Sequence, residues 1–274
     1  MTTYRTDSTD VVLTSGSSVR GGRIADLWRY PVSSIGGEQV NHLSVSTHGV
    51  LGDRQFCLYD ALTGLPASPE KEPRWRPSLF LTSRRLSDEL PEIGLGSGSW
   101  YRVDDPNLDG LLTDHFGFEV RVGEHPPADG ARKTSLQAIE GRYRPSPFHL
   151  LSNASLVALS QLCGLPSMDS RRFRANAVID FDNEIGFAEN ALIDSTLRLG
   201  GVFVKVVEDT KRCGMTLIAQ PGIEENPDVL RNVLRHNKRN LGVYCEILSS
   251  GVVSVGDAIY VVSDASAQMV AASI

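Results

Sequence analysis

The sequence predicts a mainly β protein of the α+β class, a barrel or a sandwich with a few short helices. From Gly22 onward, short segments rich in β-branched and aromatic residues recur between turn signals. Helical periodicity is confined to a few short stretches, so the strands dominate. The chain has 274 residues, of which 41% are hydrophobic and 22% charged. That length and composition suffice for one large or two small domains with a sizeable core.

The first half contains four strand-sized segments and one helical segment. The strand patterns are "RIADLWRYPV", which stops at Pro31, "RQFCLYD", which runs into the turn "ALTG", and then "SLFLTSRRL" and "FEVRVG". The segment "NLDGLLTDHFG" predicts a short helix. A polar, proline-containing region from His125 to Pro147 has little periodicity. We expect that region to be an interdomain linker or a long covering loop.

The second half opens with the clearest helical pattern, "SNASLVALSQLCG". Ser152 or Asn153 can cap this helix, and Gly164 is placed to end it in a left-handed conformation. A second short helix is predicted in "NPDVLRNVLRHN", with Asn226 as its cap and Pro227 in its first turn. The remaining strand patterns are "RANAVIDF", "TLRLG", "VFVKVVE", "GVYCEIL", "VVSVG" and "AIYVV".

These patterns divide the chain into two domains between two tails. Residues 1–21 are rich in Ser, Thr and Gly and are expected to form a flexible tail. The first domain is predicted at 22–125 and the second at 126–264. The small residues at 265–274 predict a second tail.

Charge and cysteine content exclude several classes of partner. The net charge of −6 argues against nucleic acid and against an anionic membrane surface. No apolar run approaches the roughly 20 residues that a membrane-spanning helix needs. The four cysteines lie far apart without C-x-x-C spacing, which indicates free thiols in a reducing, cytoplasmic setting. We therefore expect a small-molecule ligand.

The segment "DTKRCGMT" places Cys213 directly after Lys211 and Arg212. Neighbouring positive charge stabilises a thiolate, which is the nucleophilic and metal-binding form of cysteine. The alternative interpretation is a buried structural cysteine whose basic neighbours point into solvent. The other cysteines lie within apolar strand or helix patterns, where a packing role is the simpler interpretation; they are Cys57, Cys163 and Cys245.

Arginines form a second group of candidates. Arg54 follows Asp53 in "HGVLGDR", and "DSRRFRAN" brings Arg171, Arg172 and Arg174 close to Asn176. Guanidinium groups bind phosphate bidentately, so this cluster is a candidate anion site. A charged turn exposed to solvent is the alternative interpretation. The six histidines show no ligand spacing, and the chain has no nucleophile elbow, Walker A motif or dinucleotide fingerprint.

The order of six motifs resembles that of the MOSC-domain proteins, a family named after the C-terminal domain of molybdenum cofactor sulfurase. The motifs span about residues 22 to 264: "WRYPVSS", "HGVLGDRQFCLYD", "SPFHLLSNASLVAL", "RRFRANAVID", "KRCGMTLIAQPG" and "LGVYCEILSSGVVSVGDAI". The resemblance includes the N-terminal β-barrel domain that precedes the MOSC domain in some members. It therefore implies a two-part β-barrel architecture.

The resemblance also implies binding of the molybdenum cofactor, a pyranopterin dithiolene that bears a phosphate. In a branch similar to the mitochondrial amidoxime-reducing component, the family cysteine coordinates molybdenum and N-hydroxylated compounds are reduced with electrons from separate redox proteins. Carried over, the metal ligand and catalytic residue is Cys213. The residues implied to bind the cofactor are Ser33, Ser34, Arg54, Ser152, Asn153, Arg174, Asn176 and Arg212.

The chain departs from the family pattern at three places, one of which is Ala175 of "FRAN", where proline is usual. Members usually read Y-P-V-K-S, and Ser33 stands at the lysine position. In "GLPASPEKEPRW", Pro69 and Glu70 stand where a basic or amide side chain is common. Two alternatives to the oxidoreductase remain open. One is molybdenum-independent sulfur chemistry, either C–S bond cleavage or sulfur transfer, with Cys213 as nucleophile or persulfide carrier; the other is a non-catalytic cofactor carrier.

Overall fold

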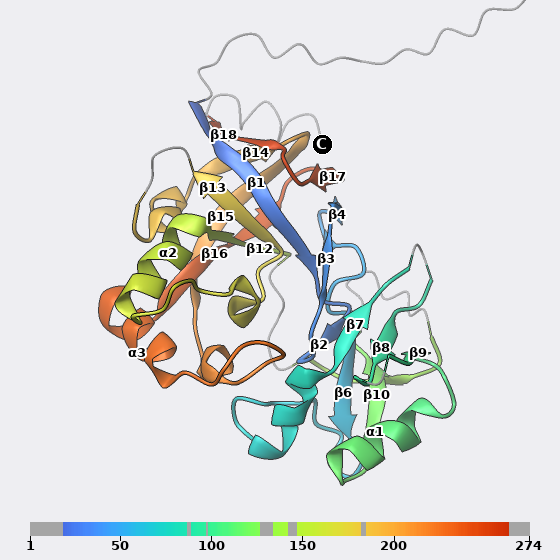
Figure 1. Cartoon of the computed structure of the whole chain (residues 1–274). Coiled ribbons are helices and arrows are strands. Elements are labelled where there is room, and N and C mark those ends of the chain that lie inside the picture. The colour runs from blue at the N-terminus through green and yellow to red at the C-terminus, as the bar shows by residue number, and fades with distance from the viewer. Residues whose placement is uncertain are drawn as a thin grey trace, which may run out of the picture.

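The computed structural model describes residues 19–86, 89–96, 98–126, 134–141, 147–181 and 185–262, and it is mainly β (Figure 1). The predicted α+β class with a β-barrel is confirmed. The predicted tail residues 1–18 and 265–274 lie outside the described residues, as do 263–264 of the predicted second domain and 127–133 and 142–146 of the predicted linker.

The described strands and helices follow one another along the chain with these bounds. The strands are β1 (Val19–Arg29), β2 (Val32–Ser33), β3 (Glu38–Val40), β4 (His42–Ser46), β5 (Gly49–Val50), β6 (Phe56–Asp60), β7 (Thr82–Arg84), β8 (Glu92–Gly94), β9 (Trp100–Arg102), β10 (Val120–Glu124), β11 (Gln137–Ala138), β12 (Phe148–Ser152), β13 (Ala177–Phe181), β14 (Thr196–Leu199), β15 (Val202–Lys211), β16 (Asn240–Ile247), β17 (Gly251–Ser254) and β18 (Ala258–Val262). The α-helices are α1 (Leu108–Phe116), α2 (Asn153–Leu162) and α3 (Pro227–His236), and the 3₁₀ segments are η1 (Pro73–Phe80), η2 (Ser170–Phe173), η3 (Ala188–Leu192) and η4 (Gly214–Leu217).

A closed barrel occupies the upper left of Figure 1. Its strand order is β13-β12-β16-β15-β14-β18-β1, and β1 pairs back with β13 to close the circle. Alternating apolar residues of these strands fill the interior; for example, Val202, Val204 and Val206 of β15 are at most 1% exposed. Closure leaves no free edge in this part of the sheet. Two of the α-helices, α2 and α3, cover one side of the barrel.

Strand β1 is the element that joins the two parts of the molecule. It begins at Val19, inside the predicted tail of residues 1–21, because its first residues pair with β18. Its last residues, Leu27 to Arg29, pair with β3. Between them a register shift from Ile24 to Asp26 marks a bulge, which bends the strand as it leaves the barrel.

A second core lies at the lower right of Figure 1. The sheet β11-β10-β6-β2 and the sheet β7-β8-β9 share it with α1 and with the fully buried Trp75 of η1. The prediction of a strand over 78–86 is wrong in its first part, since Ser78 to Phe80 belong to η1. The 3₁₀ segment η1 contains Pro73 and Pro77, and a prolyl nitrogen cannot donate a hydrogen bond to a neighbouring strand.

The three predicted α-helices are confirmed together with their caps. The Ser152 hydroxyl accepts a hydrogen bond from the Ser155 amide at the start of α2, and Gly164 is left-handed after its end. Asn226 caps α3, with Pro227 in its first turn. Within the described residues, no helix is both long enough and apolar enough to span a membrane.

The two hydrophobic cores do not follow the order of the chain. Leu43 and Val45 of β4 and Val50 of β5 come from the first half, yet they pack into the barrel core with Val253 of β17. The limits 22–125 and 126–264 therefore stay predictions, and the chain crosses between the two cores more than once. The first of these passages from one core to the other is residues 30–37, after β1. We call this segment the crossing, and it leads into the candidate site.

Candidate functional site

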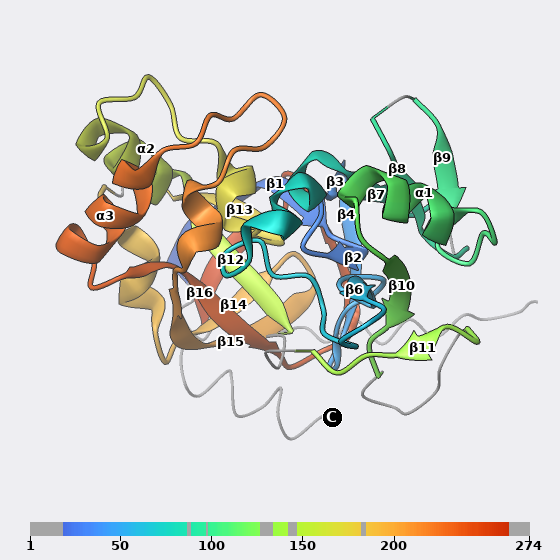
Figure 2. The same cartoon turned by 90° about the horizontal axis from the view of Figure 1, so that it is seen from below.

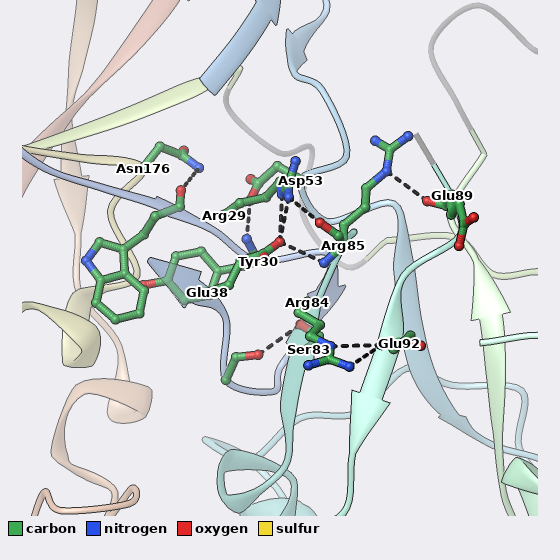
Figure 3. A network of polar contacts seen from close by, with 12 residues as sticks. Arg29, Tyr30, Glu38, Asp53, Ser83, Arg84, Arg85, Glu89, Glu92 and Asn176 are labelled. Carbon is green, nitrogen blue, oxygen red and sulfur yellow. Dashed lines mark hydrogen bonds and ion pairs between the residues drawn. The ribbon is translucent and has the colours of Figure 1, made fainter. Parts of the chain in front are cut away.

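The candidate site begins where β1 ends. The Tyr30 amide donates to Asp53 Oδ1 at 2.7 Å, and the Arg54 amide donates to the Tyr30 carbonyl at 2.7 Å. Asp53 also pairs with the Arg54 guanidinium. These bonds fasten the "GDR" turn to the end of β1, and Figure 3 shows Asp53 beside Tyr30 and Arg29. Arg54 has a φ of 49°, so its backbone is held in the left-handed region.

The same close-up shows how this junction continues into the second part of the molecule. Glu38 accepts from Arg29 Nε at 2.8 Å and from the Arg85 amide at 2.9 Å (Figure 3). Arg29 in turn donates to the Arg85 carbonyl at 2.9 Å. The ion pair between Arg29 and Glu38 is mostly shielded from solvent, with each side chain 18% exposed. The end of β1 is therefore held rigidly between the two cores.

Arg174 follows η2 and points toward Tyr30. Its φ of 54° is left-handed, and its guanidinium carbon lies 4.2 Å from the centre of the Tyr30 ring. Nη1 donates to the Ile35 carbonyl, whereas Nη2 is buried without a hydrogen-bond partner among the described residues. Burial lowers the pKa of Arg174 to about 10, so it stays cationic at neutral pH. A buried guanidinium nitrogen without a partner is unusual and fits an anionic ligand.

Arg54 also reaches the Tyr30 ring. Its Nη2 donates to the Arg174 carbonyl at 2.8 Å, and its guanidinium carbon lies 5.2 Å from the Tyr30 ring centre. Burial raises the pKa of the Tyr30 hydroxyl to about 12, so Tyr30 remains neutral beside the two cations. The structure thus brings together two of the three predicted arginines at one aromatic side chain.

His149 connects this pair of arginines to Arg212. Its Nε2 lies 2.7 Å from Arg212 Nη2, and its Nδ1 lies 3.4 Å from the Arg174 carbonyl. A guanidinium can only donate and a carbonyl can only accept, so the ring carries its proton on Nδ1. Burial, with Arg212 and Arg54 nearby, holds the pKa of His149 well below its usual value. Sequence analysis set His149 aside because no ligand spacing marks it.

Arg212 is buried, and each of its three guanidinium nitrogens has a hydrogen-bond partner within the protein. Its Nε donates to the Leu241 carbonyl at 2.7 Å and its Nη1 to the Phe173 carbonyl at 2.9 Å, besides the contact with His149. Burial lowers its pKa to about 10. Its backbone amide donates to the Arg239 carbonyl at 2.9 Å. Arg212 therefore anchors the strand that carries Cys213 and turns its charge inward.

Cys213 lies immediately after β15 and caps η4. It is half-buried, and its carbonyl accepts from the Thr216 amide at 3.2 Å and the Thr216 hydroxyl at 3.1 Å. The next residue, Gly214, faces the first half of the chain: a Cβ there would lie 3.5 Å from the Glu70 carbonyl. Figure 2 shows η1, in cyan, beside the orange segment that follows β15, and Arg76 pairs with Glu225 there at 3.3 Å. The thiol is thus held at the junction of the two parts.

Ser33 and Ser34 lie on the crossing between Tyr30 and Ile35. The Ser33 hydroxyl is 3.3 Å from His125 Nε2, whose Nδ1 lies 2.7 Å from the Ile139 carbonyl. Ser34 has a φ of 65°, and its hydroxyl donates to the Ala67 carbonyl at 3.1 Å. Both serines are partly exposed. They lie on the same short crossing as Ile35, whose carbonyl binds Arg174.

Three other predicted residues lie deeper or farther away. Asn176 is 1% exposed and ties β1 to β12, because its Oδ1 accepts from the His149 amide at 3.1 Å while its carbonyl accepts from the Trp28 amide at 2.8 Å. Ser152 lies three residues beyond His149 on β12, about 10 Å along the strand. Asn153 donates to Asp180, which lies toward the far end of β13.

A buried carboxylate already occupies the start of α2. Glu189 is 0% exposed and accepts from the hydroxyls of Ser152 and Ser155 and, at 2.8 Å, from the Gly242 amide. A helix N-terminus favours a negative charge, and here the protein supplies one itself. Nothing in the spacing of the sequence marks Glu189 as this partner. Of the predicted residues, Arg54 and Arg174 contact each other, Ser33 and Ser34 lie on the segment that follows β1, and Cys213 follows Arg212, which His149 links to the Arg174 carbonyl.

The remaining cysteines are packing residues. Cys57 and Cys245 are at most 1% exposed, and burial raises the pKa of the Cys57 thiol to about 12 and that of Cys245 further. Burial also raises the pKa of the half-buried Cys163, which lies at the end of α2. All four cysteines are free thiols. Cys213 differs from the others in its position beside the arginine cluster.

Comparison with solved structures supports the fold. The YuaD protein from Bacillus subtilis aligns over 90% of this chain and 99% of its own, with 13% identity and a TM-score of 0.50. YiiM from Geobacillus stearothermophilus aligns over 43% of this chain and 55% of its own, with 15% identity and a TM-score of 0.35. At 13% identity the likeness to the YuaD protein concerns the fold alone. The comparison with curated proteins gives no match.

Two family models match the chain in the order that the motifs predict. The model of the MOSC N-terminal beta barrel domain covers residues 21–88, and the model of the MOSC domain covers residues 134–260. Together they include the crossing after β1, the "GDR" turn, Arg174 and Cys213. The chain belongs to the MOSC-domain proteins that carry an N-terminal MOSC β-barrel domain.

Proposed function

We propose that this protein binds the molybdenum cofactor at the junction between the Cys213 turn and the Arg54–Arg174 pair, and that it works as a molybdenum-dependent oxidoreductase. The observation that carries the proposal is the buried Arg174 Nη2, which has no partner among the described residues although a second guanidinium lies next to it. Such an arrangement is costly unless an anion completes it. MOSC domains are associated with molybdenum cofactor binding, which supports the same ligand.

The residues at the junction have distinct roles in this proposal. Arg54 and Arg174 hold the anionic end of the cofactor. The hydroxyls of Ser33 and Ser34 lie on the crossing after β1, the segment whose Ile35 carbonyl binds Arg174. Cys213 supplies a thiolate to the metal. When bound, the cofactor supplies a metal centre that exchanges electrons and accepts an oxygen atom from substrate. The substrate class is a small N-hydroxylated molecule, and a separate redox protein supplies the electrons.

Arg212 and His149 act as positioning residues in this proposal. Arg212 binds the carbonyls of Phe173 and Leu241, so the backbone before Cys213 is fixed to η2 and β16. The neutral His149 ring accepts from Arg212 and donates to the Arg174 carbonyl. These hydrogen bonds therefore fix the positions of two residues, Cys213 through the backbone before it and Arg174 through its carbonyl. Preorganised groups of this kind bind without further rearrangement.

Cofactor content tests the proposal directly. The full chain is purified from a host that makes the molybdenum cofactor, and molybdenum and the oxidised fluorescent pterin are quantified together. We expect both near one per chain, and at least a ten-fold loss in Arg174→Met. Arg198→Met is the matched control, because Arg198 lies over Tyr260 on the barrel strand β14. Absence of both molybdenum and pterin from the unmodified chain would end the proposal.

Molybdenum-independent sulfur chemistry is the second candidate, and Ser33 is the observation that favours it. The serine places an uncharged hydroxyl beside His125 where the family has a lysine, which weakens the site for a phosphate. In this alternative Cys213 carries a persulfide or attacks a small molecule held by Arg54 and Arg174. Mass spectrometry after incubation with a sulfur donor should show an adduct on Cys213 that Cys213→Ser abolishes. An adduct that persists in this variant would argue against this candidate.

A further inference from the structure

A pocket of about 270 Å³ opens beside Tyr30, at the junction of the two parts of the molecule. Its volume lies just below the range of pockets that hold drug-sized ligands, so it suits a small molecule. The walls come from β1, from the crossing at Gly36 and Gly37, from η1 and β7, and from the loops around η2 and after η4. The described lining residues are Trp28, Tyr30, Gly36, Gly37, Gln39, Leu79, Thr82, Arg171, Gln220 and Pro221.

One wall of the pocket is a flat aromatic surface. The rings of Trp28 and Tyr30 lie 6.3 Å apart at 20°, so they form a nearly parallel pair. Gly37 is required beside them, since a Cβ at this position would come within 2.5 Å of the Tyr30 ring. Gly36 and Gly37 line the pocket with bare backbone, without a side chain that would fill it. A planar, conjugated ligand fills such a slot better than a puckered one because aromatic faces prefer offset stacking.

The pocket also contains an unused hydrogen-bond donor. Gln220 is 8% exposed, and its Nε2 has no partner among the described residues. Its backbone is fixed, because the Gln220 amide donates to the Ile223 carbonyl at 2.9 Å and the Ile223 amide returns the bond at 2.8 Å. Gly222 completes this turn with a φ of 74°. A buried donor held this firmly calls for an acceptor on a ligand.

The polar groups at the pocket favour a negatively charged acceptor. Arg171 lines the pocket, and Asp169 holds it through Nε and Nη2 at distances of 2.7 to 3.1 Å. No Asp or Glu occurs among the described lining residues. Across the Tyr30 ring lie the guanidinium groups of Arg174 and Arg54. Asp169 pairs with Arg171 and Asp53 pairs with Arg54, so among the described residues the positive charge near the pocket without an ion-pair partner is that of Arg174. A carboxylate satisfies both Gln220 and this charge.

We propose that this pocket binds a small planar carboxylate whose conjugated ring stacks on Trp28, since the Tyr30 ring is only 2% exposed, and whose carboxylate accepts from Gln220. Cys213 is not among the lining residues, so binding needs neither molybdenum nor the thiol. The inference thus goes beyond the proposed function. Tyr30 belongs both to this pocket and to the arginine pair, so the pocket adjoins the proposed cofactor site.

Sodium benzoate is the probe, titrated into the full chain by isothermal calorimetry with saturation-transfer NMR as a second readout. We expect saturable one-site binding, with cyclohexanecarboxylate at least several-fold weaker because its ring cannot stack flat. Gln220→Met removes the donor and keeps the length of the side chain, and we expect binding at least ten-fold weaker. Gln39→Met is the matched control, with affinity expected within two-fold. Gln39 lines the same pocket, but its Nε2 already donates to Asp26.

Two further variants keep the test decisive. Trp28→Leu removes half of the aromatic wall and should weaken benzoate binding even if Gln220→Met does not fold. Cys213→Ser should bind benzoate as the unmodified chain does, which separates this pocket from the Cys213 chemistry. Equal affinity for benzoate and cyclohexanecarboxylate, unchanged affinity in either pocket variant, or no saturable binding at all would overturn the inference.

Discussion

Ser33 is the residue at which this chain differs most consequentially from the pattern of its family. Its hydroxyl contacts His125 Nε2, and the crossing it belongs to leads to the Ile35 carbonyl, which binds Arg174. A lysine here would add one charge-assisted contact to the anionic end of the cofactor. Such a contact contributes about 1.5–3 kcal/mol, roughly ten- to a hundred-fold in affinity.

Ser33→Lys should therefore raise cofactor occupancy. When the cofactor is limiting, we expect pterin content per chain to increase by about ten-fold or to reach saturation. Ser33→Met is the control, because it adds length at the same position without charge. Pterin fluorescence after denaturation measures the content. Equal pterin content in the lysine and methionine variants would show that no phosphate lies near this crossing.

Residue-level prediction from the sequence succeeded where chemistry is local and failed where partners come from elsewhere in the fold. Motif order identified Arg54 and Arg174, which the structure brings into contact, while the role of Cys213 stays a prediction. The sequence could not show that Arg212 turns inward to Leu241. Glu189 lies 37 residues from Ser152, and nothing in either segment marks the pair. Burial of a polar partner is a property of the tertiary structure.

At the scale of elements, β12 and β16 pack against the site through a glycine. Gly242 has a φ of 80°, and a Cβ there would lie 2.7 Å from His149 Nε2 and 2.8 Å from the Leu150 carbonyl. Its amide also binds Glu189. The close approach lets His149 reach both Arg212 and Arg174. A side chain at this position would push the ring out of place.

Gly242→Ala should destabilise the protein by about 3 kcal/mol, from about 1–2 kcal/mol for the left-handed backbone and about 1–3 kcal/mol for the contact with His149. Urea unfolding followed by circular dichroism measures the change. The matched control is Gly201→Ala, where a Cβ meets nothing within 4 Å, and we expect it to change stability by less than about 0.5 kcal/mol. Equal stabilities of the two variants would contradict the role given to Gly242.

Among the secondary-structure elements, the helices were predicted best, because the residues that cap α2 and α3 can be recognised in the sequence. Ser152, Gly164 and Asn226 take the positions predicted for them. Residues 78–80 were predicted as the start of a strand because they adjoin the strand-like residues that follow them, and they form the end of η1 around the buried Trp75. Strand β1 was predicted to begin too late, because its first residues are specified by pairing with β18 rather than by their own composition.

At the scale of the whole molecule, the two cores are joined by the crossing from β1. The barrel core contains Leu43, Val45 and Val50 from the first half of the chain, and the Tyr30–Asp53–Arg54 bonds fasten the next segment to it. Independent domains joined by a linker would share few contacts of this kind. We infer that the two cores depend on each other.

The described cores should consequently unfold in a single transition. In a variant with Trp28→Phe and Trp100→Phe, the remaining tryptophan is the fully buried Trp75, so its fluorescence reports on the second core, while far-ultraviolet circular dichroism reports mainly on the strands of the larger barrel. In urea titrations we expect the two signals to have the same midpoint within error. Two separated midpoints would mean that the crossing does not couple the cores.

The central claim is that the sulfur of Cys213 meets molybdenum. X-ray absorption at the molybdenum edge counts the sulfur atoms bound to the metal in the purified protein, and Cys163, which is also half-buried and free, provides the matched variant. We predict that Cys213→Ser lowers the sulfur count by one or removes the metal, while Cys163→Ser leaves the spectrum unchanged. A molybdenum-loaded Cys213→Ser protein with an unchanged sulfur count would contradict the claim.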